Sequence, residues 1–299
     1  MALDAKTVQK PFRKLGKLLK KFPDPPSPED VHDIRTHTRR IEAMVGAFQL
    51  DCKKSGNNLA TMLKPIRKAA GNVRDMDVLT DFAASLDPNT DGDCRLRLME
   101  HLTSRRNKAA TKLSKKVSAN EKQARTGLKQ TGKLAEAGLD AANTRNANPK
   151  DKRKMREKSA DSMASSLEIE QELRDWPKLT EKNIHPFRLK VKELRYVLQL
   201  GQDSDSKLID ALGEVKNQIG LWHDWNELSG IAPKVLDHGA GCPIASQIRS
   251  RTKKELDKAL QSANALREEY LHQSRGPRKK GAVTEIHPAV VRATSRLAS

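Results

Sequence analysis

A basic helix face that occurs twice is the feature that most constrains how this chain can fold. Each copy has a histidine followed by two cations at i+3 and i+7, which a helix projects to one side. The copies are His32, Arg35 and Arg39, and, 153 residues later, His185, Arg188 and Lys192. Apolar residues at helical spacing flank both, so each copy predicts an amphipathic helix with a cation row beside its core stripe.

The repeat continues into the helix that follows each copy. Gly71–Asp77 aligns with Gly220–Asn226 at an offset of 149 residues, and Arg67 and Arg74 then fall on Lys216 and His223. A glycine in the middle of a helix costs about 1 kcal/mol relative to alanine, which predicts close approach of a neighbouring helix there. A duplicated helical unit implies a pseudo-symmetric pair of bundles, and antiparallel packing would bring both cation rows onto one groove.

Asp75 and Asp224 stand one residue after the second-helix cation in each copy. They can pair with a histidine or arginine of the partner helix, or serve as capping or surface carboxylates. Together with Asp77 they could also hold Mg²⁺. The residues leave these alternatives open.

Composition supports helices and an anionic partner. Only 3% of the 299 residues are aromatic and 32% are charged, a balance that favours long helices over β-structure. The formal net charge of +19 predicts a polyanion as partner, and nucleic acid, an anionic membrane and polyphosphate all qualify. Cys52, Cys94 and Cys242 form no CxxC pair, which is typical of a reducing cytoplasm. No apolar run is long enough to span a membrane, and we expect no secretion signal.

The order of turn signals predicts two helical halves and a tail. We expect a first bundle half over residues 1–145, a second over 146–275, and a basic flexible tail over 276–299. The predicted helices, with a turn at 55–58, cover residues 3–22, 28–53, 59–86, 93–139, 151–175, 184–200, 207–236 and 244–274.

Two further basic segments have alternative interpretations. The helix over 3–22 is basic and amphipathic, so it could lie on an anionic bilayer or pack on the rest of its bundle. Residues 95–133 hold 12 lysines and arginines against two acidic residues, which is either a solvated face or a binding surface.

The doubled motif resembles the CHAD family, the conserved histidine α-helical domain. The resemblance rests on the repeated His-x-x-Arg-x-x-x-Arg/Lys helix, the second-helix segments beginning at Gly71 and Gly220, and the run Lys192–Tyr196, and it covers about residues 10–275. It implies an all-α fold of two four-helix bundles related by pseudo-two-fold symmetry around a basic central cavity. Pro186, Pro65 and His223 depart from the family's usual pattern.

The resemblance also implies a function and a set of binding residues. Members bind inorganic polyphosphate and associate with polyphosphate granules, so we expect a cytoplasmic, non-enzymatic binding protein without a cofactor or metal and with protein partners unknown. The predicted polyphosphate ligands are His32, Arg35, Arg39, Arg40, Arg67, Arg74, His185, Arg188, Lys192, Arg195, Lys216 and His223. Arginine can hold phosphate oxygens bidentately, and lysine acts as a point charge.

Two other classes of function compete with this prediction. Non-specific nucleic-acid binding fits the net charge, although aromatic stacking platforms and known nucleic-acid motifs are lacking. An enzyme is the third class, but the chain has no P-loop, HExxH motif or nucleophile elbow. Residues 168–172 carry alternating carboxylates without the closing lysine of a triphosphate-tunnel strand, and they lie in a helical pattern.

Overall fold

The described part of the chain is helical throughout. The computed structural model describes residues 5–47, 54–87, 92–143, 166–199, 206–236 and 241–271. None of these residues lies in a β-strand, which confirms the all-α prediction. The chain divides into two units, the first formed by Met1–Ser85 with Met99–Asp151, and the second by Leu86–Leu98 with Lys152–Ser299. The predicted pseudo-symmetry and central cavity concern the placement of these units and stay predictions.

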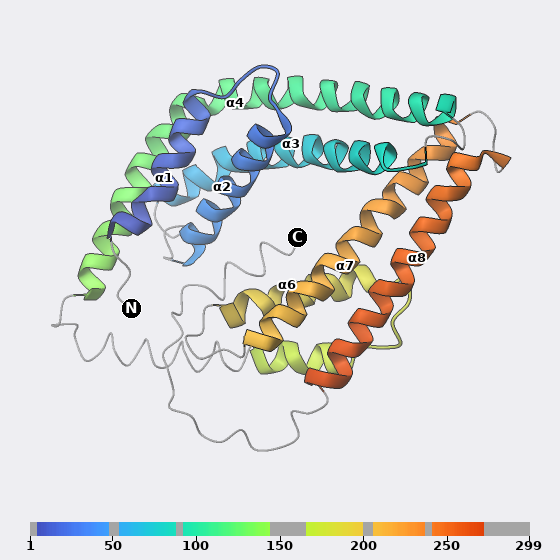
Figure 1. Cartoon of the computed structure of the whole chain (residues 1–299). Helices are drawn as coiled ribbons and strands as arrows, with labels where there is room; N and C mark the ends of the chain where they lie inside the picture. Colours follow the sequence, from blue (N-terminus) through green and yellow to red (C-terminus); the bar gives the residue numbers. More distant parts are fainter. Residues whose placement is uncertain are drawn as a thin grey trace. The chain divides into compact units, whose positions relative to one another are not determined.

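Among the described residues, four helices build the first unit, as Figure 1 labels them. They are α1 (Ala5–Lys20), α2 (Pro28–Ala47), α3 (Lys54–Ala84) and the part of α4 (Gly92–Asn143) that follows residue 98. All four contribute to one hydrophobic core because each has an apolar stripe at helical spacing. Fully buried members include Leu15, Ile34, Ile41, Leu63, Ile66 and Leu113.

The described residues of the second unit are also helices that share a hydrophobic core. A helix over 166–174 precedes α6 (Ile184–Gln199), α7 (Ser206–Ile231), the 3₁₀ turn η2 (Ala232–Lys234), α8 (Pro243–Leu266) and the π-helical turn η4 (Arg267–Leu271). Figure 1 draws α6, α7 and α8 in yellow to red. Their common core includes Leu173, Phe187, Val191, Leu194, Leu212, Ile219 and Trp222.

Most predicted helices lie where the pattern placed them, and one predicted turn is wrong. Residues 55–58 were expected to form a turn, but α3 begins at Lys54 and includes them. Glycine and asparagine are poor in helix interiors but tolerable in the first turn, where backbone N–H groups have no intrahelical acceptor. α3 also continues through Pro65. The predicted boundary near 145, the start of the 151–175 helix and the tail 276–299 lie outside the described residues.

Helix α1 uses its apolar face within the first unit. Phe12, Leu15 and Leu19 are buried in the core, and the Phe12 ring lies 3.4 Å from the position that a Cβ of Gly132 on α4 would take. This favours bundle packing over the bilayer for this helix, because the face a membrane would take is already covered. No described helix carries an apolar stretch long enough to cross a bilayer.

Local capping fixes where the two repeated helices begin. Before α2, the Ser27 hydroxyl accepts a hydrogen bond from the Asp30 backbone N–H at 3.2 Å, and the Asp30 carboxylate accepts one from the Ser27 N–H at 3.0 Å. Before α6, the Asn183 side chain accepts from the Thr180 N–H at 2.7 Å. Pro186 stands in the first turn of α6, where its missing N–H costs nothing. The first members of the two rows, His32 and His185, each stand five residues after the residue whose N–H is bound in this way, Ser27 or Thr180.

Candidate anion-binding site

In both units the two repeated helices pack against each other in antiparallel fashion. In the second unit, Arg188 of α6 reaches Lys216 of α7, while Arg195, further along α6, reaches Ile209, earlier on α7. In the first unit α2 packs on α3 in the same sense, because Arg35 lies nearest Gly71 whereas Glu42 pairs with Arg67. The antiparallel arrangement aligns the cation row of one helix with that of its partner.

The second-unit row and its partner form one group, which we call the α6/α7 cation cluster. Its members are His185, Arg188, Lys192, Arg195, Lys216 and His223, and all of them are partly exposed. The four α6 positions lie within about 80° of one another around the helix axis. The rings of His185 and His223 are 5.0 Å apart between centroids.

Two glycines on α7 make room for the arginines of α6. A Cβ on Gly220 would lie 2.9 Å from the Arg188 guanidinium, and one on Gly213 would lie 3.2 Å from Arg195 Nε. Arg188 Nε donates to the Lys216 carbonyl at 3.1 Å, so its guanidinium is held flat against the helix. The predicted close approach at Gly220 is thus made by a neighbouring side chain, and the glycine positions a cation.

Two members of this cluster, Lys216 and His185, have lowered pKa values. Burial lowers the pKa of Lys216, and the charges of Arg195 and Arg188 lower it further. Burial also lowers the pKa of His185, reinforced by His223, Arg188 and Lys192. A cation whose pKa is lowered by burial and by neighbouring cations is stabilised when an anion binds beside it.

The first unit holds a second group, the α2/α3 cation cluster, formed by Arg35, Arg39, Arg67 and Arg74. Burial lowers the pKa of Arg35, and Arg39, Arg67 and Arg74 lower it further against the opposing charge of Asp75. Arg39 buries its Nε without a hydrogen-bond partner among the described residues. A buried guanidinium N–H without an acceptor is costly, so this atom is suited to an incoming anion.

One carboxylate lies within the first cluster. Glu42 lies 2.9 Å from Arg67 Nε, and burial raises the pKa of this carboxyl against the opposing effect of Arg67. In the repeat, Glu42 corresponds to Arg195 and Arg67 to Lys216. The first cluster therefore contains an internal ion pair at the place where the second has two cations.

Two predicted ligands of the first unit stand apart from the cluster. His32 and Arg40 are exposed. Arg40 is five residues from Arg35, about 140° around the helix. The charge of Arg40 lowers the pKa of the buried His37. Arg40 is not among the residues whose charges shift the pKa of Arg35.

His37 is a buried titratable group that the sequence did not single out. It is 6% exposed, and neither ring nitrogen has a hydrogen-bond partner among the described residues. Burial lowers its pKa. The surrounding charged and titratable groups are Lys14, Asp33, Arg40 and His32, of which Asp33 alone opposes the shift. The ring is therefore accommodated in its neutral form.

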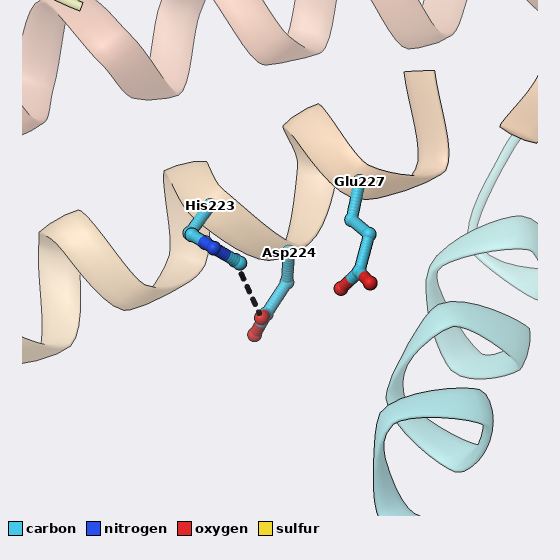
Figure 2. A group of neighbouring side chains, drawn as sticks. All are labelled: His223, Asp224 and Glu227. Carbon is cyan, nitrogen blue, oxygen red and sulfur yellow. Dashed lines mark ion pairs between the residues drawn. The ribbon is translucent and has the colours of Figure 1, made fainter. Parts of the chain in front are cut away.

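The aspartates divide into different roles. Asp77 is buried and binds Arg106 of α4 at 2.7 Å, and the same guanidinium donates to the Pro26 carbonyl at 2.9 Å. This arrangement ties α3, α4 and the segment before α2 together and argues for a structural role of Asp77. Asp224 pairs with its neighbour His223 on α7 at 3.9 Å, as Figure 2 shows, and raises the pKa of that imidazole. Asp75 acts on Arg35.

The basic segment 95–133 is largely solvated. Its exposed cations are Arg97, Arg105, Lys108, Lys112, Lys115, Lys116, Lys122, Lys129 and Lys133. Arg106 and Arg125 instead hold carboxylates, Asp77 and Glu121 respectively. A row of hydrated, mobile lysines binds anions less specifically than cations fixed between two helices.

Sequence reasoning missed three residues of these sites: Gly213, Glu42 and Glu227. Gly213 stands seven residues before Gly220, as Arg195 stands seven after Arg188, so equal spacing was the available signal. Glu42 was visible as the acidic counterpart of Arg195. Glu227 stands one turn after His223 on α7 and becomes notable only with Asp224 beside both (Figure 2).

Comparison with known proteins gave one family. The model of the CHAD domain matches residues 12–232, about three quarters of the chain. Neither the curated proteins nor the solved structures gave a match. The matched range contains α2, α3, α6 and α7, the helices that carry both cation clusters.

Proposed function

Because the chain belongs to the CHAD domain family, we propose that it binds inorganic polyphosphate through the α2/α3 and α6/α7 cation clusters. The observation that carries this proposal is the gathering of cations between paired helices, where burial and neighbouring cations together lower the pKa of Arg35 and of Lys216. Such a cluster costs free energy in the free protein, and a polyanion offsets that cost when it binds. Association with cytoplasmic polyphosphate granules belongs to the same proposal.

The chemistry of the clusters suits a chain of phosphates better than a single small anion. Several fixed cations at successive helix turns are spaced about 5–6 Å apart along each helix, so neighbouring phosphates can engage successive side chains. Each charge-assisted hydrogen bond contributes roughly 1.5–3 kcal/mol, less where water screens it. A few such contacts give micromolar affinity.

We propose a binding role without catalysis. Asp77, one of the carboxylates that could have held Mg²⁺, is occupied by Arg106. Release of orthophosphate from long-chain polyphosphate in the presence of Mg²⁺ would contradict this part of the proposal.

The decisive experiment is a polyphosphate titration of the wild type and two double variants that each remove two charges. Arg35→Ala with Arg188→Ala removes one fixed cation from each cluster and should weaken binding about 100-fold. Lys112→Ala with Lys116→Ala removes two exposed cations of α4 and should weaken it less than about threefold. If the α4 double variant weakened binding more than Arg35→Ala with Arg188→Ala does, the polyphosphate site would lie on α4.

Specificity is tested by competition at several salt concentrations. All electrostatic binding weakens as salt rises, so the salt slope alone does not identify the ligand. Short duplex DNA should displace bound polyphosphate only at a large excess of phosphate groups. Displacement at equal phosphate concentration would favour the nucleic-acid alternative, for which the exposed cations of α4 are the natural surface.

A further inference from the structure

Three potential metal ligands gather on one side of α7. His223, Asp224 and Glu227 each offer one ligand atom, and these atoms all lie within 4.8 Å of one another. His223 and Glu227 are one helix turn apart, so they project from the same side. Figure 2 shows Asp224 between them, with its carboxylate towards the imidazole. The distance from His223 Nδ1 to the Asp224 carboxylate is 3.9 Å.

We propose that His223, Asp224 and Glu227 bind a divalent transition-metal cation, with Zn²⁺ as the best-fitting ion. One imidazole and two carboxylates are ligand types that Zn²⁺ takes at about 2.0–2.2 Å, whereas Mg²⁺ and Ca²⁺ prefer oxygen alone. Donor atoms around a tetrahedral ion at that bond length lie roughly 3.4 Å apart. The present spread therefore closes by about 1 Å or slightly more, which side-chain rotation can supply.

Exposure makes this rearrangement feasible. Glu227 is exposed, and His223 and Asp224 are half-buried with side chains 43% and 42% accessible. All three stand on one continuous helix, so no movement of one element against another is needed. Three protein ligands leave a fourth position for water or another oxygen ligand.

The charges around the site are compatible with a cation despite the neighbouring cluster. Arg188 acts against positive charge on His223, and the His185 ring lies 5.0 Å from the His223 ring between centroids. The carboxylates of Asp224 and Glu227 carry two negative charges, so a divalent ion leaves the site neutral. The bound ion therefore neutralises the two carboxylates and leaves no excess positive charge to repel the neighbouring cations.

The repeat supplies an internal contrast. At the 149-residue offset, the three positions correspond to Arg74, Asp75 and Val78 in the first unit. The first unit thus has a fixed guanidinium and an apolar residue where the second has two metal ligands. With a divalent ion bound, the three α7 positions would carry no net charge, and Arg74 with Asp75 carries none in the first unit. Metal binding itself does not depend on the proposed polyphosphate function.

The test is a titration of the full chain with Zn²⁺, without polyphosphate, by isothermal calorimetry. The chain has seven other histidines that could also bind Zn²⁺. The quantity compared is therefore the binding that disappears when one of the three proposed ligands is substituted. Glu227→Gln and His223→Ala should each weaken one site at least about tenfold. Asp210→Asn, which removes an exposed carboxylate elsewhere on α7, should leave the isotherm unchanged. Equal isotherms for the wild type and Glu227→Gln would overturn the proposal.

Two additional measurements complete the test. Co²⁺ in place of Zn²⁺ should give the intense visible absorption of four-coordinate cobalt in the wild type and lose it in Glu227→Gln. Mg²⁺ should bind at least about 100-fold more weakly than Zn²⁺, and equal affinity would reject the assignment to a transition metal. Circular dichroism of each variant should match the wild type, so a lost site reports ligation and not unfolding.

Discussion

Replacing Gly220 by alanine tests the positioning of Arg188 separately from the stability of α7, the helix that contains the glycine. An alanine Cβ would lie 2.9 Å from the Arg188 guanidinium, which must move away. Gly71→Ala is the matched control, because there the Cβ would meet Arg35 Nε at 3.8 Å, an ordinary contact. Both glycines stand inside long helices, α7 and α3.

The two substitutions should have different effects on stability. Each gains about 1 kcal/mol of helix propensity when alanine replaces glycine. At Gly220 the displaced Arg188 also loses its hydrogen bond to the Lys216 carbonyl, worth about 1.5 kcal/mol for a charged donor and less at this partly exposed position. The free energy of unfolding should therefore rise by about 1 kcal/mol for Gly71→Ala and change little for Gly220→Ala.

Polyphosphate affinity should follow the arginine and not the stability. Gly220→Ala releases Arg188 from the place where it is held, so binding should weaken about tenfold, or 1.4 kcal/mol. Gly71→Ala should bind as the wild type does. Urea denaturation gives the unfolding free energies, and a fluorescence or calorimetric titration gives the affinities. Equal affinities for both variants would refute the claim that Gly220 positions Arg188.

Three further substitutions test individual contacts. Glu42→Gln removes the carboxylate paired with Arg67 and should tighten polyphosphate binding several-fold in titrations, whereas weaker binding would mean that Glu42 positions Arg67 for the ligand. His37→Leu should flatten the pH dependence of unfolding: the folded state lowers the pKa of this histidine, so its contribution is present above about pH 6.5 and lost as pH falls through the lowered pKa. Urea melts between pH 5 and 8 measure this, and parallel curves would exclude His37. Asp77→Asn should cost about 3 kcal/mol of unfolding free energy by leaving Arg106 unpaired, and a loss below about 1 kcal/mol would contradict the structural role.

The parts of the site that depend on one helix could be predicted from the sequence. The rows of Arg188 with Lys192 and of Lys216 with His223 follow from spacing, because a helix fixes which residues share a side. Their facing arrangement follows from antiparallel packing of neighbouring helices, which the order of the contacts bears out. The repeat thus specified which residues share one side of a helix.

The parts that depend on side-chain direction could not be predicted. Glu42 and Arg67 stand on separate helices, and the register that brings them to 2.9 Å depends on packing between those helices. Mid-helix glycine suggested a close helix approach, whereas the space at Gly220 is taken by a guanidinium. Residues 55–58 show the opposite failure, since local propensity predicted a turn where the chain continues a helix.

The two clusters share one helix geometry but differ in charge balance, and this difference has a physical consequence. In the first unit, Glu42 relieves the repulsion on Arg67 and so reduces what an anion can gain. In the second unit Arg195 stands at the corresponding position, and the pKa of Lys216 is lowered first by burial and then by the charges of Arg195 and Arg188. An anion gains more beside Lys216, whose neighbour Arg195 is a cation, than beside Arg67, whose corresponding neighbour Glu42 is a carboxylate, so the α6/α7 cluster should supply the larger share of polyphosphate affinity.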